Sequence, residues 1–154
     1  WAGTDIDPDD ANSFNFTAAI TIFDSLGTPH TATMYVRRTD NLEYATRVFT
    51  DGNDMGGQDL EFDNSGSLTT PQQVTYPNTF TPATGAADIG LDYDFTGSSL
   101  LGDSFSVNDL TQDGYSTGRL SGLQVSDDGV FSARFTNWRS QALGKTAMAN
   151  FDNP

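Results

Sequence analysis

The chain has 154 residues and a mass of 16.6 kDa, the size of one domain or of two small ones. Asp and Glu number 21 against 7 Lys and Arg, so the formal net charge is −14 and the isoelectric point lies near 4.1. This charge opposes binding to nucleic acid and to anionic membrane surfaces, which both attract Lys and Arg. The chain has one His and no Cys. Without Cys, the 154 residues cannot form a disulfide, a thiolate metal site or a cysteine nucleophile.

The residue composition favours strands and turns. Of the acidic residues, 19 are Asp and 2 are Glu, and Asp prefers turns and caps to helix interiors. The chain also holds 15 Gly, 20 Thr, 13 Ser and 10 Asn, while 12% aromatic residues can supply a core. We therefore predict an all-β protein. The sequence begins at Trp1 without Met, a secretory leader pattern or a long apolar run, so we expect an internal part of a longer protein without membrane insertion.

Apolar residues recur at every second position in the first part of the chain. The clearest run consists of Phe14, Phe16, Ala18, Ile20 and Ile22. A turn at residues 24–27, with Asp first and Gly fourth, leads to a second run. The second run consists of Ala32, Met34 and Val36. Because this period places one strand face in a core, we predict a β-hairpin here.

Shorter runs follow the hairpin. A third strand is predicted through Leu42, Tyr44 and Val48, and a Gly-rich loop is predicted over residues 50–59. A second hairpin is predicted around residues 63–66, where Gly66 can take a left-handed conformation. This second hairpin starts at Leu60 and Phe62 and returns at Leu68.

The middle of the chain has less regular patterning. Residues 77–88, with two Pro and one Gly, are predicted to be an excursion or a domain seam. The next run alternates apolar residues with Gly and Asp, which is typical of a half-buried strand. Its apolar members are Ile89, Leu91, Tyr93 and Phe95, and its polar face carries Gly90, Asp92 and Asp94.

The last part of the chain contains further short strands. A short one is predicted at Phe105 and Val107, and two more flank a turn at residues 127–129, with a bulge near Gly122. These two carry Leu120, Leu123 and Val125 before the turn and Val130, Phe131, Ala133 and Phe135 after it. A last extended run carries Ala147, Ala149 and Phe151. Eight or nine short strands without a sequence repeat predict an antiparallel β-barrel or sandwich.

Two acidic segments begin like calcium loops but lack the later ligands. The first starts with Asp5, Asp7 and Asp9. Its sixth position is Asp10 instead of Gly, and its twelfth is Phe16 instead of a bidentate Glu. The second, residues 51–56, would have Phe62 at its twelfth position. We therefore expect an acidic linker over residues 1–13 and a mobile loop at the second segment, and no metal site at either.

Catalytic sites lack parts in the same way. A Ser-His-Asp triad would have to use His30, and no Gly-x-Ser-x-Gly elbow is present, so we predict a structural or exposed turn histidine. Asp92 and Asp94 share the polar face of one strand, where water would screen a glycosidase pair. Trp1 and Trp138 leave two interpretations open, a sugar-stacking platform and packing against a neighbouring subunit. We predict no catalytic, cofactor or metal site.

Several segments resemble the bacterial flagellar hook protein family. Phe-Asp-Ser-Leu-Gly-Thr-Pro-His-Thr at residues 23–31, followed by Met-Tyr-Val at residues 34–36, is similar to the family's aromatic-Asp-Ser-Leu-Gly-x-x-His hairpin. The later matches are Gln-Asp-Gly-Tyr at residues 112–115, Gly118, Leu120, Asp-Asp-Gly at residues 127–129, Leu-Gly at residues 143–144, Ala147 and Ala-Asn-Phe-Asp-Asn-Pro at residues 149–154. One departure is Asn137-Trp138, where many family members have Asn-Gly.

The resemblance implies a structural subunit that is exported and polymerises with copies of itself into the extracellular flagellar hook. This helical tube is the flexible coupling between motor and filament, and the hook cap and hook–filament junction proteins are possible further partners. It also implies an outer β domain at residues 14–111 and, at residues 112–154, returning strands of an inner β domain. Because the family's terminal helices are not in this sequence, we expect the 154-residue chain to be monomeric.

The alternative is a secreted β-sandwich module that binds carbohydrate. The acidity, the absence of Cys and the two Trp residues favour it. An enzyme is not predicted, and no cofactor is expected.

Overall fold

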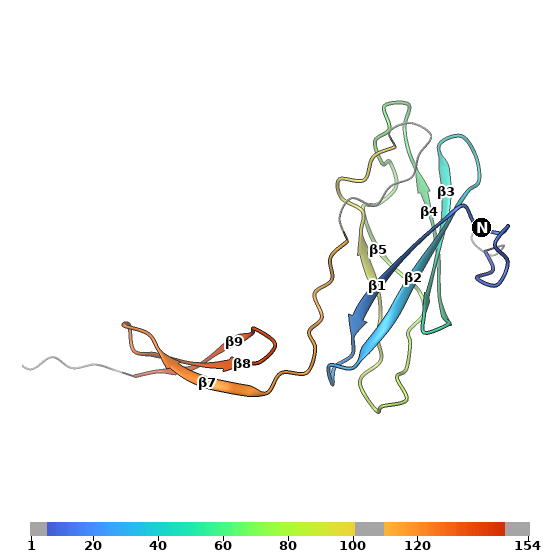
Figure 1. Ribbon diagram of the computed structural model, residues 1–154. Helices are drawn as coiled ribbons and strands as arrows, with labels where there is room; N and C mark the ends of the chain where they lie inside the picture. Colours follow the sequence, from blue (N-terminus) through green and yellow to red (C-terminus); the bar gives the residue numbers. More distant parts are fainter. Residues whose placement is uncertain (1–5, 101–109, 147–154) are drawn as a thin grey trace, which may run out of the picture.

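The chain folds into antiparallel β-sheets, which confirms the predicted all-β class. The computed structural model describes residues 6–100 and 110–146, which contain nine strands in three sheets and no helix, hence none that could cross a membrane. All three sheets are open in these residues, so the architecture is the sandwich and not the closed barrel. The sheets make two units, a larger one with strands β1–β6 and a smaller one with β7–β9. An extended segment, described over residues 110–119 and called the linker below, joins them (Figure 1).

The largest sheet is a four-stranded meander. Its strands are β1 (Phe16–Phe23), β2 (Pro29–Arg38), β3 (Glu43–Thr50) and β4 (Asn53–Glu61), and they pair in this order. β1 and β2 form the predicted hairpin, in which Ala18 lies opposite Met34 and Ile20 lies opposite Ala32. The third predicted strand is β3. Period-two alternation therefore located these three strands correctly.

β4 occupies most of residues 50–59, so the loop predicted there is wrong. Asp51 and Gly52, with φ of 47° and 81°, make the tight turn from β3 into β4. A β-bulge follows, because Val48 lies opposite Gly56 whereas Phe49 lies opposite Asp54. Met55 is the extra residue of this bulge, and its side chain is fully buried in the core. The bulge interrupts the alternation of apolar and polar residues from which a strand could have been predicted.

One face of the four-stranded sheet carries the hydrophobic core. A short two-stranded sheet of β5 (Gln73–Thr75) and β6 (Asp92–Asp94) and its flanking residues lie over this face (Figure 1). The buried members of the core are Ala32, Met34, Val36, Val48, Met55, Tyr76 and Leu91. Tyr93 packs against this core while Asp92 and Asp94 are exposed, as the alternation predicted. The hydroxyls of Tyr76 and Thr46, 2.8 Å apart, form a buried hydrogen bond between the layers.

The segments on either side of β5 make only isolated β-bridges. Phe62 pairs with Leu68 around the turn at residues 63–66, where Gly66 has the expected positive φ of 80°. Residues 77–88 contain no strand, and Phe80 at their centre forms an isolated bridge with Ile89. The predicted turn is therefore present, but the second hairpin is reduced to one residue pair.

The segment before β1 lies against the other face of the sheet. Phe14 precedes the strand, and its ring meets the ring of Tyr35 with centroids 4.8 Å apart. Tyr35 alternates with the core residues of β2, so Phe14 does not share the core face with Phe16, contrary to the prediction. Ile6 is buried in the same segment, and its carbonyl oxygen accepts a hydrogen bond from Arg47. These contacts tie residues 6–14 to the sheet.

The smaller unit is a three-stranded sheet. It consists of β7 (Leu120–Val125), β8 (Val130–Phe135) and β9 (Ser140–Lys145), paired in this order. The first two are the predicted strands, and the register shift between Leu120 and Gly122 is the predicted bulge. β9 was not predicted, because Leu143 is its only large apolar residue. The strands predicted at residues 105–107 and 147–151 lie outside the described residues.

The bulge at Met55 predicts a large cost for truncating this side chain. We expect Met55→Ala to lower the free energy of unfolding by about 2–5 kcal/mol, because a cavity replaces a fully buried side chain. Leu26→Ala, at an exposed turn position, is the control and should change it by less than about 0.5 kcal/mol. Urea unfolding followed by circular dichroism measures both. Equal losses in the two variants would contradict the assigned core.

Candidate functional site: the elbow between the two β units

A buried carboxylate organises the turn between β1 and β2. The Asp24 side chain is inaccessible to solvent, and one of its oxygens accepts hydrogen bonds from the backbone N–H groups of Leu26 and Thr28, both at 2.8 Å. Its other oxygen accepts a hydrogen bond from the Thr84 hydroxyl at 3.0 Å. The Gly27 N–H donates to the Asp24 carbonyl oxygen at 2.9 Å. The turn therefore has one fixed conformation and is fastened to the loop that contains Thr84.

His30 continues this network into the next turn. Its Nδ1 lies 2.7 Å from an Asp51 oxygen, and its Nε2 lies 3.4 Å from an Asp24 oxygen. The imidazole is 8% exposed and meets the edge of the Phe80 ring at a centroid distance of 5.2 Å. The β1–β2 turn and the β3–β4 turn are thus joined through one histidine, which occupies a buried structural position.

The three groups shift one another's pKa values in the directions expected of an ion cluster. The hydrogen bond to Asp51 raises the pKa of His30 above 6.5, and Asp24 adds to this effect against the opposing effect of burial. The hydrogen bond from the Thr31 backbone and that from His30 lower the pKa of Asp51. Burial alone would raise the pKa of Asp24, but the hydrogen bonds from Thr28, His30 and Thr84 lower it to about 2. These shifts favour the charged forms of all three groups in the folded protein.

The linker to the smaller unit lies directly on this turn. The Thr117 hydroxyl donates a 2.8 Å hydrogen bond to the Leu26 carbonyl oxygen. Gly27 has a φ of 77°, and a Cβ atom placed there would lie 2.3 Å from the backbone nitrogen of Thr117. A Cβ atom at Gly114 would lie 3.3 Å from the backbone nitrogen of Phe23. Glycine at these positions lets the linker approach the turn closely.

The same linker lies against the tip of the β8–β9 hairpin. The Asn137 side-chain amide donates a 2.8 Å hydrogen bond to the Ser116 carbonyl oxygen, and a Cβ atom at Gly118 would lie 2.6 Å from Asn137. The Arg139 guanidinium lies 4.1 Å from the centroid of the Tyr115 ring, a cation–π contact. We call the set of residues 24–28, 112–119 and 136–139 the elbow. In the elbow, the extended linker is held by one turn from each of the two β units.

The elbow brings together segments that the sequence analysis singled out separately. Two of the segments that carry the resemblance, residues 23–31 and residues 112–120, are in contact here. The sequence did not reveal the contact of Asn137 with the linker. Its only signal was the unusual Asn-Trp pair, which lies in the turn between β8 and β9. Trp138 in that turn has a φ of 64° and is 92% exposed.

The acidic candidates are engaged in local hydrogen bonds. Asp7 and Asp10 cap turns by accepting from the backbone N–H groups of Asp9 and Asn12, both at 2.9 Å. Asp54, in the second candidate loop, instead pairs with Arg47 across β3 and β4. Among the described residues, no group of three or more His, Asp or Glu side chains is arranged to hold a metal ion. Trp1 and Asp5 lie outside the described residues.

Comparison with known proteins connects this arrangement to a family. Residues 2–115 match the model of the family described as the flagellar basal body protein FlaE D2 domain. The chain belongs to this FlaE D2 family. The match includes the β1–β2 turn of the elbow and the first part of the linker, up to Tyr115.

Curated relatives of this FlaE D2 chain carry the name flagellar hook protein FlgE. The Escherichia coli K12 protein is 30% identical over 152 residues, which are 93% of this chain and 37% of the relative. The Helicobacter pylori 26695 protein is 31% identical over 167 residues, 93% of this chain and 23% of the relative. The chain thus spans little more than a third, or less, of these relatives.

A solved structure supports the fold. The crystal structure of Helicobacter pylori flagellar hook protein FlgE2 superposes with a TM-score of 0.53 at 14% sequence identity. The superposition covers 84% of this chain and 31% of that chain. The likeness extends over most of the FlaE D2 chain and is a likeness of fold.

The close approach at Gly27 predicts a stability loss larger than its backbone strain. We expect Gly27→Asn to lower the urea midpoint and Gly27→Val to lower it further, because a β-branched residue tolerates positive φ poorly. The strain alone amounts to about 1 kcal/mol or more.

Gly97 provides the matched control for this prediction. It has a φ of 84°, and a Cβ atom there would meet no atom of the described residues within 4 Å. The same substitutions at Gly97 should therefore show the strain without the clash against Thr117. Equal losses at Gly27 and Gly97 would contradict close packing of the linker on the turn.

The His30 cluster predicts a decrease in stability as the pH rises above 6.5. Because the pKa of His30 is raised from 6.5 in the folded state, its stabilisation is fully present below pH 6.5 and is lost as the pH rises through the raised pKa. We expect the urea midpoint to fall over this window and the fall to be absent in His30→Gln. The pKa of Asp24 is lowered, so its contribution is present above pH 3.8 and is lost as the pH falls toward 2. An equal fall of the urea midpoint above pH 6.5 in the wild type and in His30→Gln would contradict the cluster.

Proposed function

We propose that this chain is part of a structural subunit of the bacterial flagellar hook and that the subunit polymerises with copies of itself. The observation that carries the proposal is its membership of the FlaE D2 family, together with FlgE relatives that align over more than nine-tenths of its length. A structural role without catalysis accords with a site made of turns, caps and linker contacts. The proposed location is the extracellular flagellum.

The elbow supports a mechanical role. A subunit of a flexible coupling has to transmit force between its parts, and the elbow connects the two β units through hydrogen bonds and close backbone packing. At the same time, the outward surface is rich in Asp, Asn and Thr. Polar surfaces of this kind suit many weak contacts that exchange as neighbouring subunits slide.

We also propose the domain division expected from the sequence. Residues 1–13 are an acidic linker, residues 14–111 are the outer β domain, and residues 112–154 contribute strands to an inner domain. The exposed apolar side chains of the three-stranded sheet support the last assignment. Leu123 is 65% exposed and Leu143 is 61% exposed, values that suit a sheet completed by other segments of a longer subunit.

Further partners follow from the same proposal. A hook subunit at either end of the polymer would meet the hook cap or the hook–filament junction proteins. Nucleic acid and a lipid surface are not proposed as partners, because the net charge of −14 repels both.

The oligomeric state tests the proposed function. We expect the 154-residue chain to sediment as a monomer near 16.6 kDa, because its charge is strongly repulsive at low salt. We expect a full-length subunit that contains it, of the length of its FlgE relatives, to form tubular polymers seen by electron microscopy. A full-length subunit that stays monomeric under conditions in which its FlgE relatives polymerise would contradict the proposal.

The carbohydrate-binding alternative makes the opposite prediction. Such a module would give saturable heat with a glycan in titration calorimetry, whereas a hook subunit should give none. Trp138 is the described aromatic residue best exposed for stacking on a sugar. Loss of saturable glycan binding in Trp138→Ala would establish the alternative.

A further inference from the structure

Trp138 is presented to solvent from a fixed base. It is 92% exposed, yet both of its neighbours are held in the elbow. Asn137 donates a hydrogen bond to the linker at Ser116, and Arg139 stacks on Tyr115. The position of the indole is therefore defined by the hairpin tip even though the indole itself packs on little of the described chain. A large rigid side chain held in this way is typical of an interface anchor.

The backbone at Trp138 disfavours the residue that occupies it. A φ of 64° lies in the left-handed region, which Gly and Asn enter readily and a bulky residue enters with strain. Exposure of the indole adds the unfavourable hydration of a large apolar surface. Neither disadvantage is offset by contacts in the described residues. The combination points to a contact with another surface as the role of this side chain.

Charge is distributed unevenly between the two β units. Of the 7 Lys and Arg residues in the chain, 4 lie between residues 119 and 145, where only 2 acidic residues occur. In contrast, residues 6–100 contain 14 acidic residues and 3 Arg. The unit that carries Trp138 is therefore weakly basic, and the sandwich is strongly acidic. Opposite charges of this kind favour contact between the small unit of one copy and the sandwich of another.

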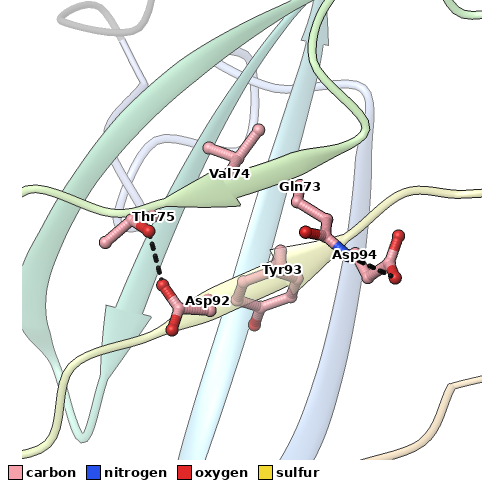
Figure 2. Close-up of a pocket in the computed structure, with 6 residues that line it drawn as sticks. All are labelled: Gln73, Val74, Thr75, Asp92, Tyr93 and Asp94. Atoms are coloured by element: carbon pink, nitrogen blue, oxygen red, sulfur yellow. Dashed lines mark hydrogen bonds between the residues drawn. The ribbon is translucent and has the colours of Figure 1, made fainter.

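The sandwich offers a receiving surface at β5 and β6. Figure 2 shows a groove there, lined by six residues: Gln73, Val74, Thr75, Asp92, Tyr93 and Asp94. Asp92 accepts a 2.6 Å hydrogen bond from the Thr75 hydroxyl, and Asp94 is held by Thr96, so both carboxylates have defined positions. Val74 and Tyr93 pack toward the core, and only part of their surface lines the groove. The groove thus combines two fixed negative charges with a small exposed apolar area, which suits a Trp next to an Arg.

We propose that the hairpin tip with Trp138 and Arg139 docks on the β5–β6 groove of a second copy of this chain. The proposal rests on the proposed function, because it supplies one of the contacts of a self-assembling subunit. The 92% exposure of Trp138 shows that the tip does not reach the groove of its own copy. One copy therefore carries both halves of a head-to-tail contact, and such a contact extends into an open polymer when the rotation between successive copies does not close a ring.

Trp138→Gly in the full-length subunit is the decisive variant. Glycine removes the anchor and also relieves the positive φ, so the urea midpoint of the monomer should stay the same or rise while assembly weakens. We expect the association constant to fall about tenfold or more, as for other Trp anchors. Trp138→Tyr should restore most of the affinity. Leu110→Ser, at an exposed position outside the elbow and outside the groove, is the control and should assemble normally.

A double-mutant cycle identifies the receiving surface. Asp92→Asn combined with Asp94→Asn removes two charges, while the amides retain oxygen atoms that can accept the local hydrogen bonds. If the tip docks there, this variant should weaken assembly, and adding Trp138→Gly should cost less than the sum of the separate losses. Additive losses would overturn the β5–β6 groove as the receiving site.

The outcomes also separate this inference from the proposed function. Polymers of normal affinity in Trp138→Gly would overturn the docking contact and leave the proposed function intact. A lower urea midpoint in Trp138→Gly would show that the indole is covered within its own subunit, which also overturns the contact. Absence of polymers in the wild-type subunit would instead contradict the proposed function itself.

Discussion

The arrangement of the elbow depends on one buried negative charge. The Asp24 carboxylate is inaccessible to water, and such a group is tolerated only where donors replace its hydration. Those donors come from Leu26 and Thr28 within the turn, from Thr84 in a distant loop and from His30 in β2. A different turn conformation would leave the charge without partners. The surface that this turn presents to the linker is therefore set by electrostatics inside the sandwich.

Two glycines transmit that constraint to the smaller unit. Gly27 lets the backbone of Thr117 come within contact of the turn, and Gly118 lets the linker come within contact of Asn137. The linker has no regular secondary structure of its own, so its course depends on these contacts and on the hydrogen bonds beside them. A chain segment that would be flexible in isolation becomes a defined connection, because a turn on each side excludes alternative paths.

Sequence patterns predicted those parts of the fold in which local periodicity and burial agree. The hairpin of β1 and β2 and the strand β3 follow a strict alternation, and the structure has them where expected. β4 was missed because the bulge at Met55 and the adjacent Gly56 interrupt that alternation. For the site, the resemblance pointed to the segments that form the elbow, but the pairing of Thr117 with Leu26 joins residues 91 positions apart. Contacts of such separation leave no mark in a single sequence.

The two β units differ in how much of their apolar surface is buried within the described residues. In the sandwich, β5 and β6 cover the sheet face that holds Val48 and Met55, so its stability is internal. In the smaller unit, Leu123 and Leu143 remain largely exposed, and the sheet gains little from burial within the described chain. The sandwich can therefore keep its geometry as a rigid body, while the smaller unit gains little stability from burial within the described residues. The elbow, placed between them, lets a stable body orient a sheet that has little hydrophobic core of its own among the described residues.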